Sequence, residues 1–249
     1  MLLSNARIII TGAASGIGKS MALNFVNCNA IVYALDFNDS LLDALQKECP
    51  RINVYPCDVS DNTSVEKIVD SIFEKDCCVN VLINNAGIMI NSPLINLLKR
   101  PDDRHRLDLW EKVIQVNQSG VFYTTRVFVS NMIKLRNKGV VVNISSISAK
   151  GNIGQTAYSA SKAAVEAMTK VWAKELGVFG IRSVAIAPGF MDTAGARDAL
   201  EEKMLNTWIS KTPLKRTGNI EEVVSAVQFT IENDFLNGEV ININGGLII

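Results

Sequence analysis

A tyrosine and a lysine four positions apart, Tyr158 and Lys162, are the residues of this chain best suited to acid–base chemistry. On an α-helix, residues four apart lie on one face, so the phenol and the ammonium would share one wall of a site. A free phenol loses its proton near pH 10, and a fixed ammonium in a partly desolvated cleft can lower that pKa by about three units, or roughly 4 kcal/mol. The pair could therefore transfer protons at neutral pH. The alternative is an ordinary pair of side chains on a helix surface.

The composition excludes several other functions. The chain has 249 residues, of which 48% are hydrophobic, and its 25 basic and 25 acidic residues cancel. This balance gives no electrostatic reason to expect a nucleic acid or an anionic membrane as partner. No apolar run approaches the roughly 18 residues of a membrane span, and the N-terminus lacks the order of a signal peptide. We therefore expect a soluble cytoplasmic protein.

The histidine and cysteine counts narrow the chemistry further. Because His105 is the single histidine, we do not expect a Ser-His-Asp hydrolase site or most histidine-based zinc sites, and we expect no metal. The cysteines are odd in number and show no CxxC spacing, which predicts reduced, buried thiols in an intracellular protein. They are Cys28, Cys49, Cys57, Cys77 and Cys78.

The N-terminal part of the chain has the order strand, glycine loop, helix. Residues 6–11 are a short apolar run, and residues 11–18 read TGAASGIG before helical periodicity begins. This order aims backbone N–H groups and a helix N-terminus at a phosphate, although the spacing is GxxxGxG and not GxGxxG. A second strand, residues 30–36, ends at Asp36, where a carboxylate would bind the ribose hydroxyls of NAD.

The rest of the chain continues the alternation of strand and helix, which predicts an α/β fold with a parallel sheet covered on both faces. A capping box at residues 63–66 is expected to open one helix. No linker divides residues 1–249, so we expect one domain, with an elongated polar loop at 88–108 and an irregular flap at about 190–217. Further strands are expected at 52–57, 81–83, 140–144, 183–187 and 239–243, and further helices at 41–48, 109–136, 155–178 and 220–231.

Together these motifs resemble the short-chain dehydrogenase/reductase family, in its branch of about 250 residues that includes the 3-oxoacyl-[acyl-carrier-protein] reductases. The resemblance implies a single-domain, doubly wound Rossmann-type fold with a seven-stranded parallel sheet, and NAD bound at the carboxyl ends of the strands. The matching segments cover nearly the whole chain. They are the glycine loop, Asp36, Cys57-Asp58-Val59, Asn84-Asn85-Ala86-Gly87, Asn117, Asn143-Ile144-Ser145-Ser146, Tyr158 with Lys162, Pro188-Gly189 with Thr193, and Gly245-Gly246.

The resemblance also implies a role for each matching residue. Tyr158 would exchange a proton with the substrate oxygen, and Lys162 would lower the phenol pKa and bind the nicotinamide ribose. Asn117 would hold a water that links Lys162 to solvent, and Ser146 would hydrogen-bond the substrate oxygen. The implied cofactor-binding set is Gly12, Ser15, Gly16, Ile17, Gly18, Asp36, Asp58, Val59, Asn85, Ala86, Gly87, Tyr158, Lys162, Pro188, Gly189 and Thr193.

The identity of the catalytic serine stays open between two neighbours. Family members usually place it second in the Ser-Ser pair and thirteen residues before the tyrosine. Here Ser146 is second but twelve residues before Tyr158, and Ser145 is thirteen before it. We favour Ser146, because a deletion in the following loop is easily absorbed, and we keep Ser145 as the alternative.

The leading functional interpretation is an NAD(H)-dependent oxidoreductase that transfers a hydride between nicotinamide and an alcohol or ketone. One alternative is a 3-oxoacyl-[acyl-carrier-protein] reductase of fatty-acid synthesis, for which residues 99–106 would be the basic docking segment, diluted by two aspartates. An alternative of another class is a non-catalytic NAD-binding sensor or scaffold. We expect a homotetramer, the usual state in the family. The 88–108 loop is either a solvated insertion or a rim that touches substrate or a neighbouring subunit.

Overall fold

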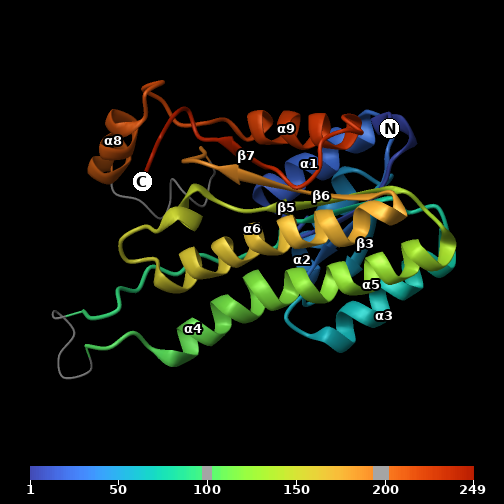
Figure 1. Cartoon of the computed structure of the whole chain (residues 1–249), viewed down its shortest axis with the longest axis horizontal. Helices are drawn as coiled ribbons and strands as arrows, with labels where there is room; N and C mark the ends of the chain where they lie inside the picture. Colours follow the sequence, from blue (N-terminus) through green and yellow to red (C-terminus); the bar gives the residue numbers. More distant parts are fainter. Residues whose placement is uncertain (97–102, 193–201) are drawn as a thin grey trace.

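The computed structural model of the chain describes residues 1–96, 103–192 and 202–249, with side chains from residue 206 onward in the last range. Its centre is a sheet of seven parallel strands in the order β3-β2-β1-β4-β5-β6-β7, with helices on both faces (Figure 1). The strand order changes direction between β1 and β4, which in such folds creates a crevice at the carboxyl ends of those two strands. The strands are β1 Arg7–Thr11, β2 Ile31–Asp36, β3 Asn53–Pro56, β4 Val81–Asn84, β5 Gly139–Ile144, β6 Ile181–Pro188 and β7 Val240–Ile243.

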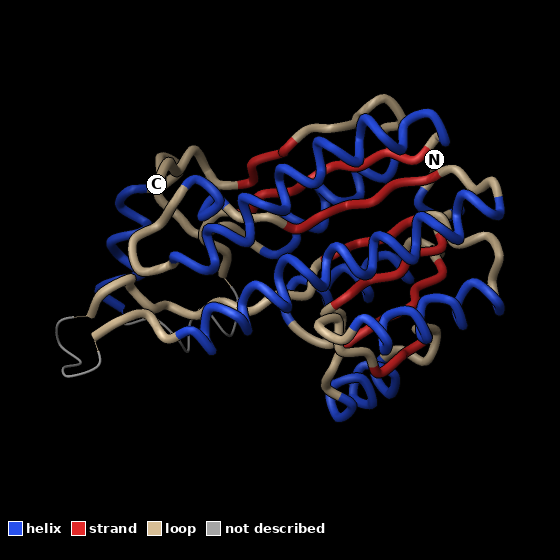
Figure 2. Tube along the Cα trace, turned by 60° about the horizontal axis from the view of Figure 1, so that its bottom comes forward, coloured by secondary structure: helices blue, strands red, loops and turns tan. Residues whose placement is uncertain are grey.

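Two hydrophobic layers hold the helices on the sheet. Because side chains alternate across a strand, Ile8 and Ile10 of β1 enter one layer and Ile9 enters the other. The first layer includes side chains of α1, α2 and α9, and the second includes side chains of α3, α5 and α6. Figure 2 shows the strands running side by side beneath the helices of one face. The helices are α1 Gly16–Asn27, α2 Asp39–Glu48, α3 Asn62–Lys75, α4 Leu107–Ile114, α5 Gly120–Leu135, α6 Thr156–Leu176, α8 Glu202–Lys211 and α9 Ile220–Glu232.

This arrangement confirms the predicted doubly wound α/β fold with a seven-stranded parallel sheet. The core strands are nearly continuous apolar runs because helices bury both of their faces. Most predicted elements lie within two or three residues of their observed bounds. The single long helix expected at 109–136 is instead α4 and α5, joined by a π-helical turn at Gln115–Ser119.

Two local predictions were wrong. The capping box at residues 63–66 does not form, because Asp61 is the N-cap of α3 and accepts the N–H of Thr63 at 2.9 Å. All five cysteines are free, but only Cys57 is buried, and Cys77 and Cys78 are exposed. These two thiols follow the last turn of α3 in a polar corner, where no apolar layer covers them.

The described part of the 88–108 loop is tied to the segment that precedes α6. The backbone N–H of Ser92 donates to the carbonyl of Gly154 at 2.7 Å, and the Gln155 amide donates to Asn91 at 3.0 Å. His105 reaches the Ser92 carbonyl through Nδ1 at 2.9 Å, so this nitrogen carries the proton. Within the described residues the loop is therefore anchored beside the start of α6.

None of the helices in the described ranges combines the length and the apolar composition that crossing a membrane requires.

Candidate active site

The four predicted catalytic residues converge at the carboxyl ends of β4 and β5. Ser146 follows β5, and Tyr158 and Lys162 lie in the first two turns of α6, which packs against the same edge. The Ser146 hydroxyl lies near enough to the Tyr158 phenol to lower the phenol pKa. The Lys162 Nζ lies 5.8 Å from the centroid of the Tyr158 ring. The sequence predicts that Tyr158 and Lys162 share one wall, and the structure places these two side chains close together.

The surroundings of the two adjacent serines differ. Ser145 is buried, and its hydroxyl donates to the Glu166 carboxylate at 3.1 Å and to the Lys162 carbonyl at 3.3 Å. Ser146 instead lies near Tyr158, and its Oγ accepts the N–H of Ser148 at 3.1 Å. Ser146 is therefore the serine whose hydroxyl faces the phenol, which supports the strand-end criterion over the loop count.

Lys162 is almost fully buried, with 4% of its surface exposed. Its ammonium donates a hydrogen bond of 2.7 Å to the Ile144 carbonyl at the end of β5. Burial lowers the pKa of Lys162 to about 8, because the interior disfavours the charged form. This lysine can therefore gain and lose a proton near neutral pH.

The expected lowering of the Tyr158 pKa by Lys162 does not appear in this arrangement. Burial raises the pKa of Tyr158, and the nearby Ser146 hydroxyl offsets part of that rise. The Lys162 ammonium donates its hydrogen bond to the Ile144 carbonyl and not to the phenol oxygen. At neutral pH the phenol thus holds its proton, which suits it to be a proton donor.

Asn117 lies in the π-helical turn between α4 and α5, a distortion that is frequent at functional sites. Its side chain brackets the backbone of Ile88: Nδ2 donates to the carbonyl at 2.9 Å, and Oδ1 accepts the N–H at 2.8 Å. Nδ2 also donates to Ser161 at 3.3 Å. The amide therefore fixes the segment after β4, and a relay water held by Asn117 would have to use its remaining acceptor positions.

Replacing Lys162 by Met is expected to change how stability depends on pH. Below about pH 8, Lys162 is charged in the folded protein, and its burial lowers the free energy of unfolding. Above that pH, Lys162 loses its proton in the folded protein. In the unfolded chain the side chain keeps its proton up to about pH 10.4. The unfolded state then binds more protons, so wild-type stability rises with pH. Relative to Lys162→Met, the wild-type free energy of unfolding should gain about 2 kcal/mol between about pH 7 and pH 10.

The measurement is denaturant unfolding of wild type and Lys162→Met at several pH values. Lys170→Met is the matched control, because Lys170 lies two turns further along α6 and is exposed. If both substitutions gave the same pH dependence, Lys162 would not be buried in its charged form.

The glycine loop has the geometry of a phosphate cradle. Gly12 and Gly16 adopt left-handed backbone conformations, with φ of +64° and +52°. A Cβ on Gly18 would lie 2.0 Å from the Gly12 carbonyl oxygen, whereas a Cβ on Gly16 would meet nothing within 4 Å. Ser15 is the N-cap of α1 but makes no side-chain capping bond. The first N–H groups of α1, at Gly16, Ile17 and Gly18, therefore suit an anionic group such as a pyrophosphate.

Asp36 lies at the end of β2, next to this loop, with 7% of its surface exposed. Its carboxylate accepts the N–H of Ala14 at 3.0 Å and the N–H of Asn38 at 3.1 Å. These bonds fix the carboxylate at the side of the glycine loop. The position fits the predicted contact with a ribose.

The remaining predicted cofactor residues border the same crevice. Asn85 donates to the carbonyls of Thr11 and Gly12 at 3.0 and 2.9 Å, so its amide joins the segment after β4 to the glycine loop. Gly12 also packs closely on Ala86: a Cβ added at Gly12 would lie 2.7 Å from the Cα of Ala86. Gly87, the next residue, lies close to Lys162: a Cβ added at Gly87 would lie 3.5 Å from the Lys162 Nζ. This set thus connects the glycine loop to Lys162.

Two further pairs of predicted residues lie after β3 and at the end of β6. Asp58 is exposed and accepts the N–H and hydroxyl of Ser60, while Val59 is buried and packs on Gly120. Pro188 ends β6, and the N–H of Gly189 donates to the Ile243 carbonyl at 2.8 Å. Thr193 lies outside the described residues.

The described part of the flap encloses a separate hollow. Phe190 stacks on Trp208 of α8, with ring centroids 5.9 Å apart. A cavity of about 490 Å³ lies between the flap and the end of β7, lined by residues such as Phe190, Leu214 and Asn244. None of its lining residues belongs to the predicted catalytic set. Within the described ranges, no cluster of three or more His, Cys, Asp or Glu side chains could hold a metal ion.

Sequence reasoning missed two residues that support the site. The Thr11 hydroxyl at the end of β1 accepts the N–H groups of Asn85 and Ala86 at 3.0 and 3.1 Å. Glu166, one turn after Lys162, is nearly buried and binds both Ser145 and Lys150, each at 3.1 Å. Their positions give the signal that could have identified them: a hydroxyl at a strand end, and a carboxylate on the buried face of α6.

The chain is similar along almost its whole length to several known proteins. The family model described as Enoyl-(Acyl carrier protein) reductase matches residues 12–248. The chain is 42% identical to the 3-oxoacyl-[acyl-carrier-protein] reductase FabG of Thermotoga maritima over the full length of both. It is 36% identical to human 3-hydroxyacyl-CoA dehydrogenase type-2 and 32% identical to sorbitol-6-phosphate 2-dehydrogenase of Klebsiella pneumoniae. Each alignment covers 96% of this chain and 94% of the relative. The crystal structure of gox2181 superimposes with a TM-score of 0.89 at 27% identity, over 99% of this chain and 98% of that one.

Proposed function

The chain belongs to the short-chain dehydrogenase/reductase family, and from this premise we propose that it is an NAD(H)-dependent oxidoreductase that interconverts an alcohol and a ketone. The observation that carries the proposal is the convergence of Ser146, Tyr158 and the buried Lys162, whose Nζ lies 5.8 Å from the Tyr158 ring centroid. The cradle at Gly16 and the carboxylate of Asp36 fit the pyrophosphate and ribose of a dinucleotide. Bound nicotinamide supplies the hydride.

The protein positions the substrate and supplies a proton. In reduction, Tyr158 donates its phenolic proton to the substrate carbonyl oxygen, and the Ser146 hydroxyl donates a hydrogen bond to the same oxygen. Burial favours this direction, because it raises the pKa of Tyr158 and keeps the phenol protonated. Burial also lowers the pKa of Lys162 to about 8, so proton transfer from Lys162 to the phenolate left behind is downhill. In oxidation, Tyr158 accepts the proton.

The relatives favour a 3-oxoacyl thioester as the substrate class. The Thermotoga maritima relative is named for a 3-oxoacyl carrier-protein substrate, and the human relative for the corresponding hydroxyacyl-CoA. Both names describe a carbon two positions from a thioester carbonyl that changes between ketone and alcohol. We therefore propose reduction of a 3-oxoacyl thioester as the more specific activity. The docking segment expected at residues 99–106 lies mostly outside the described residues.

The test is a panel of acetoacetyl thioesters, simple ketones and keto-sugar phosphates, assayed with NADH by the loss of its absorbance. The proposal expects the highest kcat/KM with an acetoacetyl thioester. If NADH bound but no carbonyl compound were reduced, a non-catalytic sensor or scaffold would be the better interpretation. Turnover of keto-sugars alone would retain the enzyme and reject the thioester.

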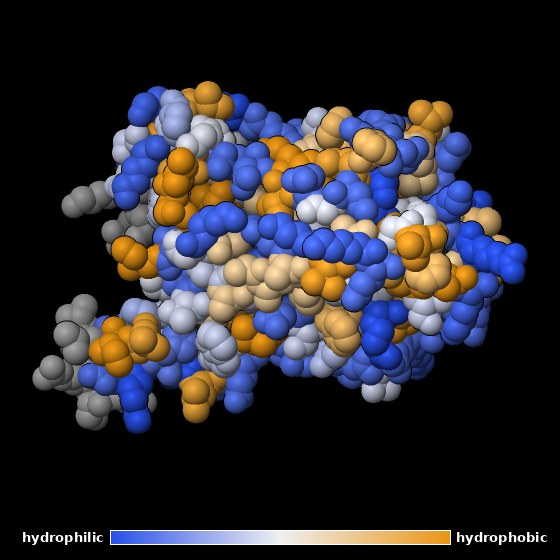
Figure 3. All heavy atoms as spheres, viewed as in Figure 1, coloured by the Kyte–Doolittle hydropathy of each residue, from blue (hydrophilic) through white to orange (hydrophobic). Residues whose placement is uncertain are grey.

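A homotetramer is part of the proposal, and its expected interface includes α6. Ala160, Ala163 and Ala167 are exposed along one side of this helix, where their small side chains permit close approach of another helix. Figure 3 draws this face, with a pale orange area where α6 crosses it. At the C-terminus Leu247 is buried within the chain, whereas Ile248 is 91% exposed and could join a second contact. Light scattering at micromolar concentration should give four times the 27.2 kDa chain mass, and a monomeric mass would refute this prediction.

A further inference from the structure

Cys77 and Cys78 form an exposed pair of thiols far from the candidate active site. Their sulfurs are 3.9 Å apart. They lie in the turn between α3 and β4, at the edge of the sheet where the strands begin, whereas Ser146 and Asp36 lie where strands end. The length of a strand, on the order of 15 Å, therefore separates the two places.

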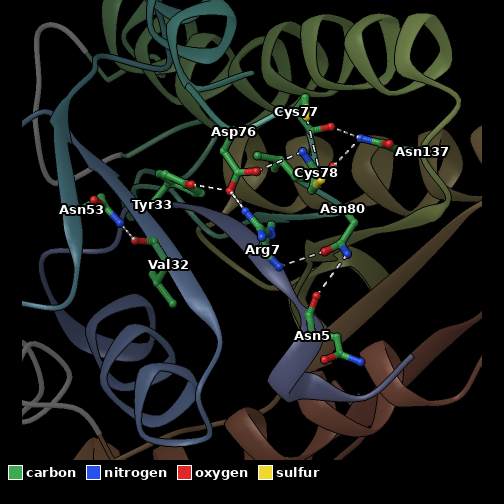
Figure 4. A network of polar contacts seen from close by, with 11 residues as sticks. Asn5, Arg7, Val32, Tyr33, Asn53, Asp76, Cys77, Cys78, Asn80 and Asn137 are labelled. Atoms are coloured by element: carbon green, nitrogen blue, oxygen red, sulfur yellow. Dashed lines mark hydrogen bonds and ion pairs between the residues drawn. The ribbon is translucent and has the colours of Figure 1, made fainter. Parts of the chain in front are cut away.

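The peptide unit between the two cysteines is held on both sides (Figure 4). Its N–H, on Cys78, donates to the Asp76 carboxylate at 3.0 Å. Its carbonyl, on Cys77, accepts the side-chain amide of Asn137 at 2.6 Å, and the same amide reaches the Val79 carbonyl at 3.3 Å. These bonds fix the plane of the peptide that carries both side chains.

Asp76 is itself anchored by the start of the sheet. Its carboxylate accepts hydrogen bonds of 2.6 Å from the Arg7 guanidinium and from the Tyr33 phenol, and only 8% of its surface is exposed. These partners outweigh its burial and keep the pKa of Asp76 below its ordinary value. The charged carboxylate thus stays in place, and the two thiols project from a rigid base into solvent.

This rigidity disfavours a disulfide between the pair. Sulfurs 3.9 Å apart would have to approach by roughly 1.9 Å to form a bond of about 2.0 Å. Adjacent Cα atoms are about 3.8 Å apart, which is below the usual range for bridged cysteines, so closing the ring would twist the peptide. Such a twist would break the bonds to Asp76 and Asn137. One atom inserted between the sulfurs avoids that twist, because side-chain rotation alone can adjust their separation.

We propose that Cys77 and Cys78 form a bidentate binding site for monosubstituted trivalent arsenicals, R–As(OH)₂, and for soft electrophiles of the same two-site valence. Arsenic in this class keeps one bond to carbon and needs only two sulfur ligands. The absence of a third His, Cys, Asp or Glu ligand around the pair in the described structure therefore does not prevent binding. The site is independent of the proposed oxidoreductase activity.

The binding step balances without an oxidant. Two As–S bonds form, two As–OH bonds break, and each thiol proton leaves with a hydroxide as water, so that two waters are released and no electrons are transferred. The hydrogen bond between the sulfurs raises the pKa of the Cys78 thiol, which keeps its proton available for this condensation. The same protonation slows oxidation of this thiol, because the thiolate is the reactive nucleophile.

The test uses phenylarsine oxide, which hydrates to the diol, and intact-mass measurement of the full chain. Wild type should form a one-to-one adduct with loss of two waters from the diol form, and its unfolding midpoint should rise with ligand concentration. Cys77→Ser and Cys78→Ser should each weaken binding by about 10²–10⁴-fold, because the second sulfur acts at high effective concentration. Cys28→Ser is the matched control and should bind like wild type, since Cys28 has no adjacent thiol.

A small dithiol should remove the arsenical, and a monothiol at the same thiol concentration should leave it bound. The proposal is overturned if wild type binds no more tightly than Cys78→Ser. It is also overturned if Cys28→Ser loses the adduct, or if a monothiol strips it as readily as a dithiol.

Discussion

Replacing Tyr158 by Phe is expected to lower kcat by about 10²–10⁴-fold, the usual contribution of a positioned acid–base group. The substitution removes the phenolic hydroxyl with its proton and leaves the aromatic ring, so the packing of this side chain is retained. Ser146 keeps its hydrogen bond from the N–H of Ser148 and stays close to its present position. The dissociation constant for NADH should therefore change little. The measurements are kcat with one accepted ketone and NADH binding by fluorescence titration.

Two further variants test whether the loss of turnover is specific to Tyr158. Lys162→Ala should damage both turnover and NADH binding, because this residue is proposed to serve the proton and the nicotinamide ribose. Tyr123→Phe is the control for losing a phenol elsewhere. The Tyr123 hydroxyl accepts a hydrogen bond of 3.3 Å from Gln115, its one hydrogen-bond partner among the described residues, and turnover should be unchanged. Wild-type turnover by Tyr158→Phe would reject the proposed mechanism.

The fold could be predicted because its signals are local and repeat along the chain. Apolar runs such as residues 6–11 identify strands buried on both faces, and the helical periodicity between them identifies the crossovers. Helix ends were less predictable. Asp61 caps α3 although Thr63 and Glu66 match a capping box, because the chain enters the helix two residues earlier and Arg126 binds Glu66 instead.

The placement of the candidate site could be predicted as well, since the residues after β1, β2, β4 and β5 must meet at one edge of a parallel sheet. What sequence spacing could not give is the direction of each side chain. Ser145 and Ser146 are indistinguishable by type, yet one points at Glu166 and the other at Tyr158. Likewise, the ammonium of Lys162 is committed to a backbone carbonyl, so burial and not a charge pair governs both pKa values.

Exposure was the least predictable property. The composition rule for intracellular cysteines predicts buried thiols, and it is correct for Cys57, which lies under α3. It fails for Cys77 and Cys78 because the polar network of Arg7, Asp76 and Asn137 fixes that turn at the surface. Those partners come from three distant parts of the chain, which no local pattern connects.

The expected cofactor preference rests on the charge around Asp36. A 2′-phosphate on the adenosine ribose would bring close to two negative charges against this carboxylate, each pair costing roughly 4 kcal/mol at an effective dielectric near 20 before screening. The carboxylate cannot easily turn away, because the N–H groups of Ala14 and Asn38 hold it. With NAD, the same oxygens accept hydrogen bonds from the ribose hydroxyls.

The positions that could supply a compensating cation do not do so. Phe37, directly after β2, is 75% exposed and neutral, and Ser15 in the glycine loop is exposed and neutral. Lys19, on the first turns of α1, is engaged in an ion pair of 2.7 Å with Glu48. A phosphate at Asp36 would therefore be repelled without relief from these residues.

We expect NADH to be preferred over NADPH by at least about tenfold in kcat/KM, which corresponds to about 1.4 kcal/mol and is well below the estimated repulsion. Replacing Asp36 by Ala together with Phe37 by Arg should move the preference toward NADPH. Because this variant also loses the bonds to Ala14 and Asn38, the quantity to compare is the ratio of the two efficiencies, measured with one accepted ketone. Asp39→Ala is the matched control: Asp39 is exposed in the first turn of α2, and its loss should leave the ratio unchanged. Equal or greater efficiency with NADPH in the unmodified protein would mean that Asp36 does not face the ribose.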